Sequence, residues 1–127
     1  MKLTTKQKNF LRLHSEIVVE CLPEDLEIEG NASAIDPETD AAIAQEIRDQ
    51  LEAGNEWAWC CIMVSVSWKG FEGVDYLGAC SYKSKADFME SDGYFPDMVA
   101  RAFDELVEAI ESDMENMLTL WEQEKLA

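Results

Sequence analysis

The sequence contains few of the residues and motifs that catalytic and metal sites depend on. Its 127 residues include one histidine, His14, and the nearest cysteine, Cys21, follows seven residues later. On a helix this separation is about 10 Å along the axis, so the two form no local nucleophile–base pair. No C-x-x-C pair occurs, and the adjacent Cys60 and Cys61 would point to opposite faces of a strand, so zinc is not predicted. A glycine-rich phosphate loop is also missing, and we expect no catalytic residue, metal or cofactor.

Long apolar runs are missing as well. No run of about 18 apolar residues occurs, so no membrane-spanning helix is predicted. The apolar positions near the N-terminus are interrupted by Arg12, His14 and Glu16, which does not fit a signal peptide. We therefore expect a cytoplasmic protein with reduced, at least partly buried thiols, at Cys21, Cys60, Cys61 and Cys80.

Basic residues are scarce relative to acidic ones. The chain has 10 lysines and arginines against 27 aspartates and glutamates, for a net charge of −17. Residues 16–56 hold thirteen acids against Arg48 alone, and residues 97–127 hold nine acids against two bases. Such a chain repels nucleic acids and anionic membranes, so we expect it to bind neither directly. The first 15 residues contain no acid and are predicted to counter the protein's own acidic helices, through Lys2, Lys6, Lys8 and Arg12.

Two helices are predicted in the N-terminal half. The first is capped by Thr4 or Thr5 and ends before Pro23, with one apolar face formed by Phe10, Leu13, Ile17, Val18 and Cys21. The second begins after Asp36, a good N-cap, has Pro37 in its first turn, and stops at Gly54. Its apolar residues lie one turn apart, at Ile43, Ile47 and Leu51. Between these helices, the alternation over 26–30 predicts a short edge strand.

An antiparallel hairpin is predicted over residues 57–82, which are rich in aromatic and β-branched residues. The turn lies in the KGFEG segment, residues 69–73. One face of the first strand comprises Ala58, Cys60, Ile62, Val64, Val66 and Trp68, and one face of the second comprises Val74, Tyr76, Gly78, Cys80 and Tyr82. The register remains open, because either Cys60 or Ile62 can lie opposite Cys80. Ser84, followed by Asp87, then predicts a short capped helix that ends near Gly93.

A long C-terminal helix is predicted from Asp97 almost to the end, roughly 40 Å in length. Its apolar stripe comprises Val99, Ala102, Phe103, Leu106, Ile110, Met114, Met117, Leu118 and Trp121. We expect Leu106 and Ile110 to be buried against the sheet. The predicted fold is α+β, a single domain over residues 1–127, in which this helix packs on an antiparallel hairpin or small sheet with two N-terminal helices.

The C-terminal helix also carries regularly spaced carboxylates. Asp104, Glu108, Glu111 and Glu115 recur at spacings of four, three and four residues, and so line one helix face. Duplex DNA likewise presents charge at regular intervals, one per ~3.4 Å along each strand. The predicted partner-binding residues are therefore Asp97, Asp104, Glu108, Glu111, Glu115 and Glu122.

One segment resembles a known group of proteins. The pattern Y-L-G-x-C-S-Y-x-S occurs as Tyr76, Leu77, Gly78, Cys80, Ser81, Tyr82 and Ser84. It is similar to a segment shared by small, acidic proteins of unassigned activity that bacteriophages and prophages encode, and the similarity covers roughly residues 56–107. The resemblance implies the cytoplasm of a bacterial host. In size and charge, such proteins are similar to inhibitors of host anti-DNA defences, including restriction and CRISPR effectors.

These observations give two hypotheses of function. The first is a non-enzymatic inhibitor that mimics nucleic acid and binds a host protein at a basic, nucleic-acid-binding surface through its acidic helices. The alternative is a phage interaction module that binds a host or phage partner through an apolar or aromatic patch, its acidity serving solubility. Exposed side chains at Trp57, Trp59 and Tyr94 would favour the alternative, whereas a continuous acidic ridge would favour the first. The sequence defines neither the partner nor the oligomeric state.

Overall fold

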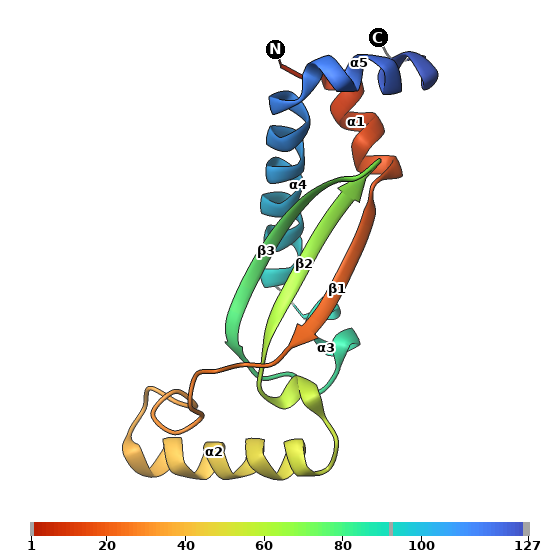
Figure 1. Cartoon of the computed structure of the whole chain (residues 1–127). Helices are drawn as coiled ribbons and strands as arrows, with labels where there is room; N and C mark the ends of the chain where they lie inside the picture. Colours follow the sequence, from red (N-terminus) through yellow and green to blue (C-terminus); the bar gives the residue numbers. More distant parts are fainter. Residues whose placement is uncertain (1, 92, 126–127) are drawn as a thin grey trace. The chain divides into compact units, whose positions relative to one another are not determined.

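The protein combines helices with one antiparallel sheet, as predicted. The computed structural model describes residues 2–91 and 93–125, apart from the side chain of Glu115. Its elements, shown in Figure 1, are α1 (Thr5–His14), β1 (Glu16–Leu22), α2 (Pro37–Glu52), the 3₁₀ turn η1 (Glu56–Ala58), β2 (Cys60–Trp68), β3 (Phe71–Cys80), α3 (Lys85–Glu90), α4 (Tyr94–Ser112) and α5 (Met114–Gln123). The strand order is β1-β2-β3, which leaves β1 and β3 as the edges.

Contacts between residues divide the chain into two compact units. The first unit comprises Met1–Val18, Val64–Asp75 and Pro96–Ala127, and the second comprises Val19–Met63 and Tyr76–Phe95. No helix within the described residues is long and apolar enough to cross a membrane.

The prediction of one helix from Thr4 or Thr5 to Pro23 is wrong for residues 16–22. Thr4 caps α1 through a reciprocal capping box with Gln7, but the helix ends at His14 and residues 16–22 form the edge strand β1. The β-branched Ile17, Val18 and Val19 favour an extended chain that pairs with β2. In consequence Leu13, which was predicted on the apolar face, is 81% exposed. The strand predicted at 26–30 is also wrong, because these residues lie in a loop.

The hairpin is confirmed, and its turn fixes a register that the sequence left open. Lys69 and Gly70 both have positive φ, as a two-residue type I′ turn requires, so Trp68 and Phe71 flank the turn. The β2 face that comprises Cys60, Ile62, Val64, Val66 and Trp68 is buried. On β3 the buried side includes Gly73, so the grouped Val74, Tyr76 and Gly78 lie on the opposite side, where Tyr76 is 57% exposed. Cys80 returns to the buried side after Ala79, whose positive φ marks a bulge in the strand.

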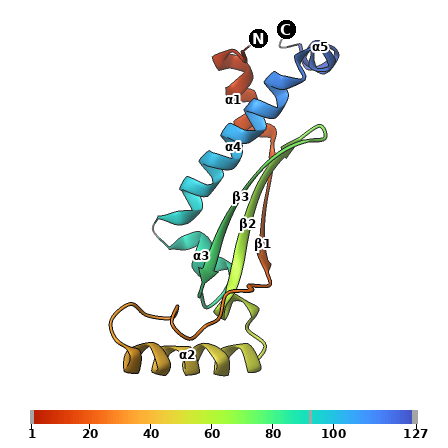
Figure 2. The ribbon, with the colours of Figure 1, turned by 60° about the vertical axis from the view of Figure 1, so that its left-hand side comes forward.

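In the first unit, α4 packs closely on the hairpin. Leu106 and Ile110 are fully buried, as predicted, in a core with Val66 and Trp68 of β2. Gly73 permits this approach, because a Cβ added there would lie 1.8 Å from the carbonyl oxygen of Ala102. Figure 2 shows α4 beside the strands. The packing fixes which face of α4 remains exposed.

The predicted single C-terminal helix is two helices. α4 ends at Ser112, and α5 begins after Asp113, where the chain changes direction (Figure 1). Serine and aspartate are weak helix formers, since their side chains compete for nearby backbone groups, although Asp113 does not cap the backbone of α5. Ser112 donates to the carbonyl of Glu108, and Asp113 accepts from the side chain of Asn116. The bend keeps Trp121 in the core, stacked on Trp68 with ring centroids 4.9 Å apart.

The second unit is organised around α2, which forms as predicted from its Asp36 cap. Asp40 is buried and accepts three backbone N–H groups of the preceding loop, from Gly30, Ala32 and Ser33 at 2.6–3.0 Å. These bonds hold the pKa of the Asp40 carboxyl below its ordinary value. The loop is tied further where the Trp59 indole N–H donates to the carbonyl of Leu26.

Candidate functional site

The exposed side of α4 is the first candidate site. The buried stripe of this helix runs from Met98 to Ile110, so the opposite side faces solvent. Asp97, Asp104 and Glu108 are all exposed there, and none forms an ion pair with a described residue. We name these three residues the acidic row. They are predicted site residues that the structure brings onto one helix face.

One basic residue lies within the row without neutralising it. Arg101 is one turn from both Asp97 and Asp104, but its Nε donates to Oδ2 of Asp75 on β3 at 2.9 Å. Its charge is thus matched by a carboxylate outside α4. The acidic row keeps a net negative charge, and Glu105 adds an exposed carboxylate that the sequence analysis did not select.

Glu111 does not belong to the exposed row. Its side chain is 12% exposed, and one of its oxygens accepts the backbone N–H of Leu3 at 2.8 Å. The other oxygen lies 3.6 Å from Nζ of Lys2. This N–H and this ammonium hold the pKa of the Glu111 carboxyl below its ordinary value. Glu111 therefore anchors the N-terminal arm, and the predicted counter-charge role of the arm holds at Lys2.

The other two predicted residues do not extend the row along one helix. Glu122 is exposed but lies on α5, beyond the bend at Asp113. The backbone of Glu115 is also in α5, and its side chain lies outside the described part of the structure. The expected continuous ridge is therefore limited to the row on α4.

Several acids in the second unit have structural roles. Besides Asp40, Asp36 caps α2 by accepting from Thr39, and Glu29 forms an ion pair with Arg48. Glu24 accepts the backbone N–H of Ala79, beside the bulge in β3. Exposed carboxylates without a described ion pair remain on α2, at Glu38, Glu46 and Glu52. Part of the acidity of residues 16–56 therefore holds the loops of this unit in place.

An apolar groove adjoins the acidic row within the first unit. It has a volume of about 330 Å³ and is lined by Leu11, Arg12, Ser15, Ile17, Val66, Pro96, Val99, Ala100, Phe103 and Asp104. We name it the α4 groove. The guanidinium of Arg12 stacks on the Phe103 ring at 4.7 Å, and Asp104 belongs both to the groove and to the acidic row. The sequence analysis did not find this site, because its walls come from three distant segments.

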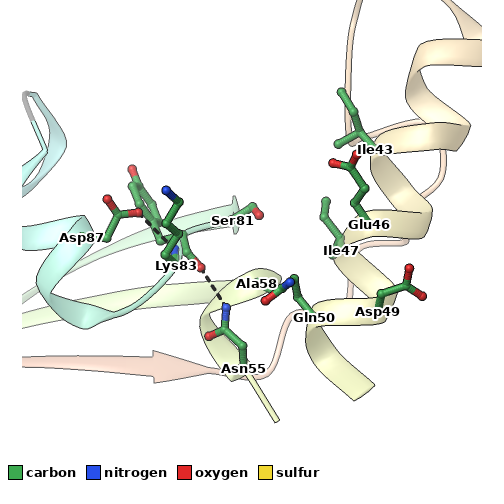
Figure 3. Close-up of a pocket in the computed structure, with 11 residues that line it drawn as sticks. Ile43, Glu46, Ile47, Asp49, Gln50, Asn55, Ala58, Ser81, Lys83 and Asp87 are labelled. Atoms are coloured by element: carbon green, nitrogen blue, oxygen red, sulfur yellow. Dashed lines mark hydrogen bonds between the residues drawn. The ribbon is translucent and has the colours of Figure 1, made fainter. Parts of the chain in front are cut away.

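A wider depression of about 780 Å³ lies in the second unit (Figure 3). Side chains of α2 such as Ile43, Ile47 and Glu46 form one wall, and residues 81–83 with Asp87 form the other. Asn55 spans its base by donating to the carbonyl of Tyr82 at 3.3 Å. Its lining includes no histidine and no cysteine, so it brings no thiol or imidazole base beside Ser81.

The cysteines are free and at least partly buried, as predicted. Burial raises the pKa of the Cys60 thiol well above its ordinary value and that of Cys80 to about 11. The Cys21 thiol donates to the carbonyl of Glu56 at 3.3 Å. Protonated, buried thiols are poor nucleophiles, which fits a packing role. Within residues 2–91 and 93–125, no three ligating side chains are grouped as a metal site requires.

The aromatic residues named for the alternative hypothesis are mostly packed inside the second unit. Trp59 is 8% exposed, and the half-buried Trp57 stacks on Phe88 at 6.2 Å. Tyr94 is exposed.

The chain matched no protein-family model, no curated protein and no solved structure. The choice between the hypotheses therefore rests on the surfaces described above.

Proposed function

We propose that the protein binds a basic, nucleic-acid-binding surface of another protein through the acidic row on α4, without catalysing a reaction. The observation that carries the proposal is the exposure of Asp97, Asp104 and Glu108 on one helix face without ion pairs. Asp104 and Glu108 lie one turn apart, where like charges destabilise a helix slightly, and neither carboxylate forms an ion pair with a described residue that would offset this cost. A basic partner would compensate for it.

The spacing of the row supports mimicry of a nucleic acid. Four residues from Asp104 to Glu108 rise about 6 Å along the helix, and two phosphate steps of one DNA strand rise about 6.8 Å. Seven residues from Asp97 to Asp104 rise about 10.5 Å, against about 10.2 Å for three phosphate steps. A surface that binds successive phosphates would therefore find carboxylates at similar intervals.

The resemblance to phage-encoded proteins suggests the biological role. We propose that the partner is a host protein acting on nucleic acids in defence, such as a restriction or CRISPR effector, and that occupation of its basic surface inhibits it. The net charge of −17 supports this role, since electrostatic steering speeds association with a basic target.

The test compares two double variants with the same change in charge. Asp104→Lys with Glu108→Lys alters the acidic row, and Glu46→Lys with Glu52→Lys alters exposed, unpaired residues on α2. Tagged native protein is used to capture partners from a bacterial lysate at low and high salt, and a captured nucleic-acid-binding protein is then titrated with each variant. We expect the α4 variant to associate with the captured protein at least roughly tenfold more slowly than the native protein. The α2 variant is expected to associate at close to the native rate.

Competition with DNA completes the test. If the row occupies a nucleic-acid site, duplex DNA and the native protein exclude each other from the captured partner, and rising salt weakens the complex. Equal losses for both double variants would show that net charge alone drives binding. A ternary complex with DNA would contradict the mimicry.

A further inference from the structure

The α4 groove is an apolar site that the described chain leaves without a cover. Gly73 lets α4 lie close to β3, which is the edge strand on the opposite side of the sheet from β1. Ile17 on β1 lines the groove and is 48% exposed, although it is a large apolar side chain. Exposed apolar surface of this kind, enclosed by walls on several sides, is typical of binding sites.

The groove also contains an unsatisfied polar atom. The hydroxyl of Ser15, at the junction of α1 and β1, is buried and has no hydrogen-bond partner within the described residues. Leaving a buried polar atom unpaired is costly. Small-molecule and peptide sites commonly combine apolar walls with a few such polar groups.

The charge around the groove indicates what kind of occupant it takes. Asp104 lies in the groove wall and in the acidic row, so an occupant of the groove lies beside the row. The one basic side chain of the lining, Arg12, is turned onto Phe103. A second copy of the chain would bring another net charge of −17 to this face, which opposes self-association. Charge complementarity therefore favours a basic occupant.

We propose that the α4 groove receives an apolar side chain of the partner, from a segment in which lysine or arginine residues flank that side chain. The flanking cations contact Asp104 and the rest of the acidic row, and the apolar side chain lies between Ile17, Val99 and Ala100. This inference rests on the proposed function. It adds an apolar side chain of the partner as the contact that distinguishes the target from other basic, nucleic-acid-binding surfaces. Charge supplies the rate of encounter, and the buried side chain supplies the residence time.

Three synthetic peptides test the proposal with the native protein. The first consists of lysines around one central phenylalanine. The second has serine in place of the phenylalanine, and the third keeps the phenylalanine but has glutamate in place of every lysine. Affinity is measured by calorimetry, and the contact site is located from the amide chemical shifts of Ile17, Val99 and Ala100. We expect the first peptide to bind about tenfold more tightly than the second, with shifts centred on the groove.

Two pairs of variants of the protein complete the experiment. Ala100→Trp fills the groove from an exposed position on α4, and Ala86→Trp makes the same change on α3. Ile17→Asn removes the exposed apolar wall, and Leu13→Asn removes an equally apolar side chain that does not line the groove. We expect the two groove variants to abolish the tenfold preference for phenylalanine, and the two controls to retain it. Thermal unfolding confirms that each variant is folded.

The outcomes separate this inference from the proposed function. Equal binding of the phenylalanine and serine peptides, or shifts away from the groove, would overturn the inference and leave the charge-based function intact. Equal binding of the glutamate peptide would instead overturn the role of charge, and with it both proposals. A preference for phenylalanine that survives Ala100→Trp would also place the apolar contact elsewhere and overturn the inference.

Discussion

Replacing Gly73 with alanine is expected to destabilise the protein, although alanine is ordinarily the better residue in a strand. The change from glycine usually gains about 0.5–1 kcal/mol, because glycine loses more conformational freedom on folding. At position 73, however, the new Cβ would lie 1.8 Å from the Ala102 carbonyl oxygen and 2.5 Å from the Leu106 nitrogen. Both are backbone atoms of α4, which no side-chain rotation can move away.

The size of the effect follows from the displacement required. Ordinary contact begins near 3.4 Å, so α4 must shift by about 1.6 Å at Ala102 to accommodate the methyl group. Overpacking of a closely packed core typically costs about 1–3 kcal/mol, and backbone contact places this site at the upper end. A cost of about 2–3 kcal/mol, less the gain of about 0.5–1 kcal/mol from replacing glycine, gives an expected net loss of about 1–2.5 kcal/mol, or roughly 3–5 °C in Tm for each kcal/mol.

Gly78→Ala is the matched control on the same strand. A Cβ at this position would lie 2.9 Å from Oε1 of Glu24, the side-chain atom that accepts the backbone N–H of Ala79. The methyl group therefore displaces a carboxylate and weakens one hydrogen bond, but it moves no backbone atom. Urea unfolding followed by circular dichroism measures both variants. We expect Gly78→Ala to stay within about 1 kcal/mol of the native protein, because the weakened hydrogen bond, about 0.5–1.5 kcal/mol, is offset by the gain of about 0.5–1 kcal/mol from replacing glycine. If Gly73→Ala were as stable as the native protein, α4 would not rest on the β3 backbone, and its exposed face would be assigned wrongly.

Two further predictions concern the two units separately. Leu106→Ala should cost about 2–5 kcal/mol in urea unfolding, because the side chain is fully buried in the core of the first unit; a loss below about 0.5 kcal/mol, typical of surface changes, would contradict that placement. Asp40→Asn should lower the Tm near neutral pH, because its carboxylate accepts three backbone N–H groups of the loop. Since the folded-state pKa of Asp40 is lowered, its contribution is fully present above the ordinary aspartate pKa near ~3.9 and is lost as the pH falls through the folded value. The Tm difference from the native protein should therefore shrink in acid, and an equal difference at pH 7 and pH 3 would contradict the role of the charge.

The acidic row could be located from the sequence, but which carboxylates of α4 lack a partner in the fold could not. The spacing of Asp97, Asp104 and Glu108 already places them on one helix face, and their exposure follows from the apolar stripe on the opposite side. Glu111 fits the same spacing equally well. It differs only because Lys2 and Leu3, more than a hundred positions earlier, bind its carboxylate.

The sequence by itself determined the features whose causes are local. The net charge, the cap of α2 at Asp36 and the short helix after Ser84 depend on residues within one helix turn, and the two strands of the hairpin follow from their composition and alternation. These signals act between neighbours along the chain, so no knowledge of the fold is needed to recognise them.

Only the tertiary structure decided the rest. The apolar spacing of residues 10–21 fits a helix, but β1 forms because β2 offers its segment a strand to pair with. The stripe from Ile110 to Trp121 fits an unbroken helix, but the chain bends at Asp113 and Trp121 stacks on Trp68. The walls of the α4 groove meet only when three separate segments, residues 11–17, Val66 and residues 96–104, fold together. In each case the deciding contact joins residues far apart in sequence, where the local preferences of the chain are weaker than strand pairing and core packing.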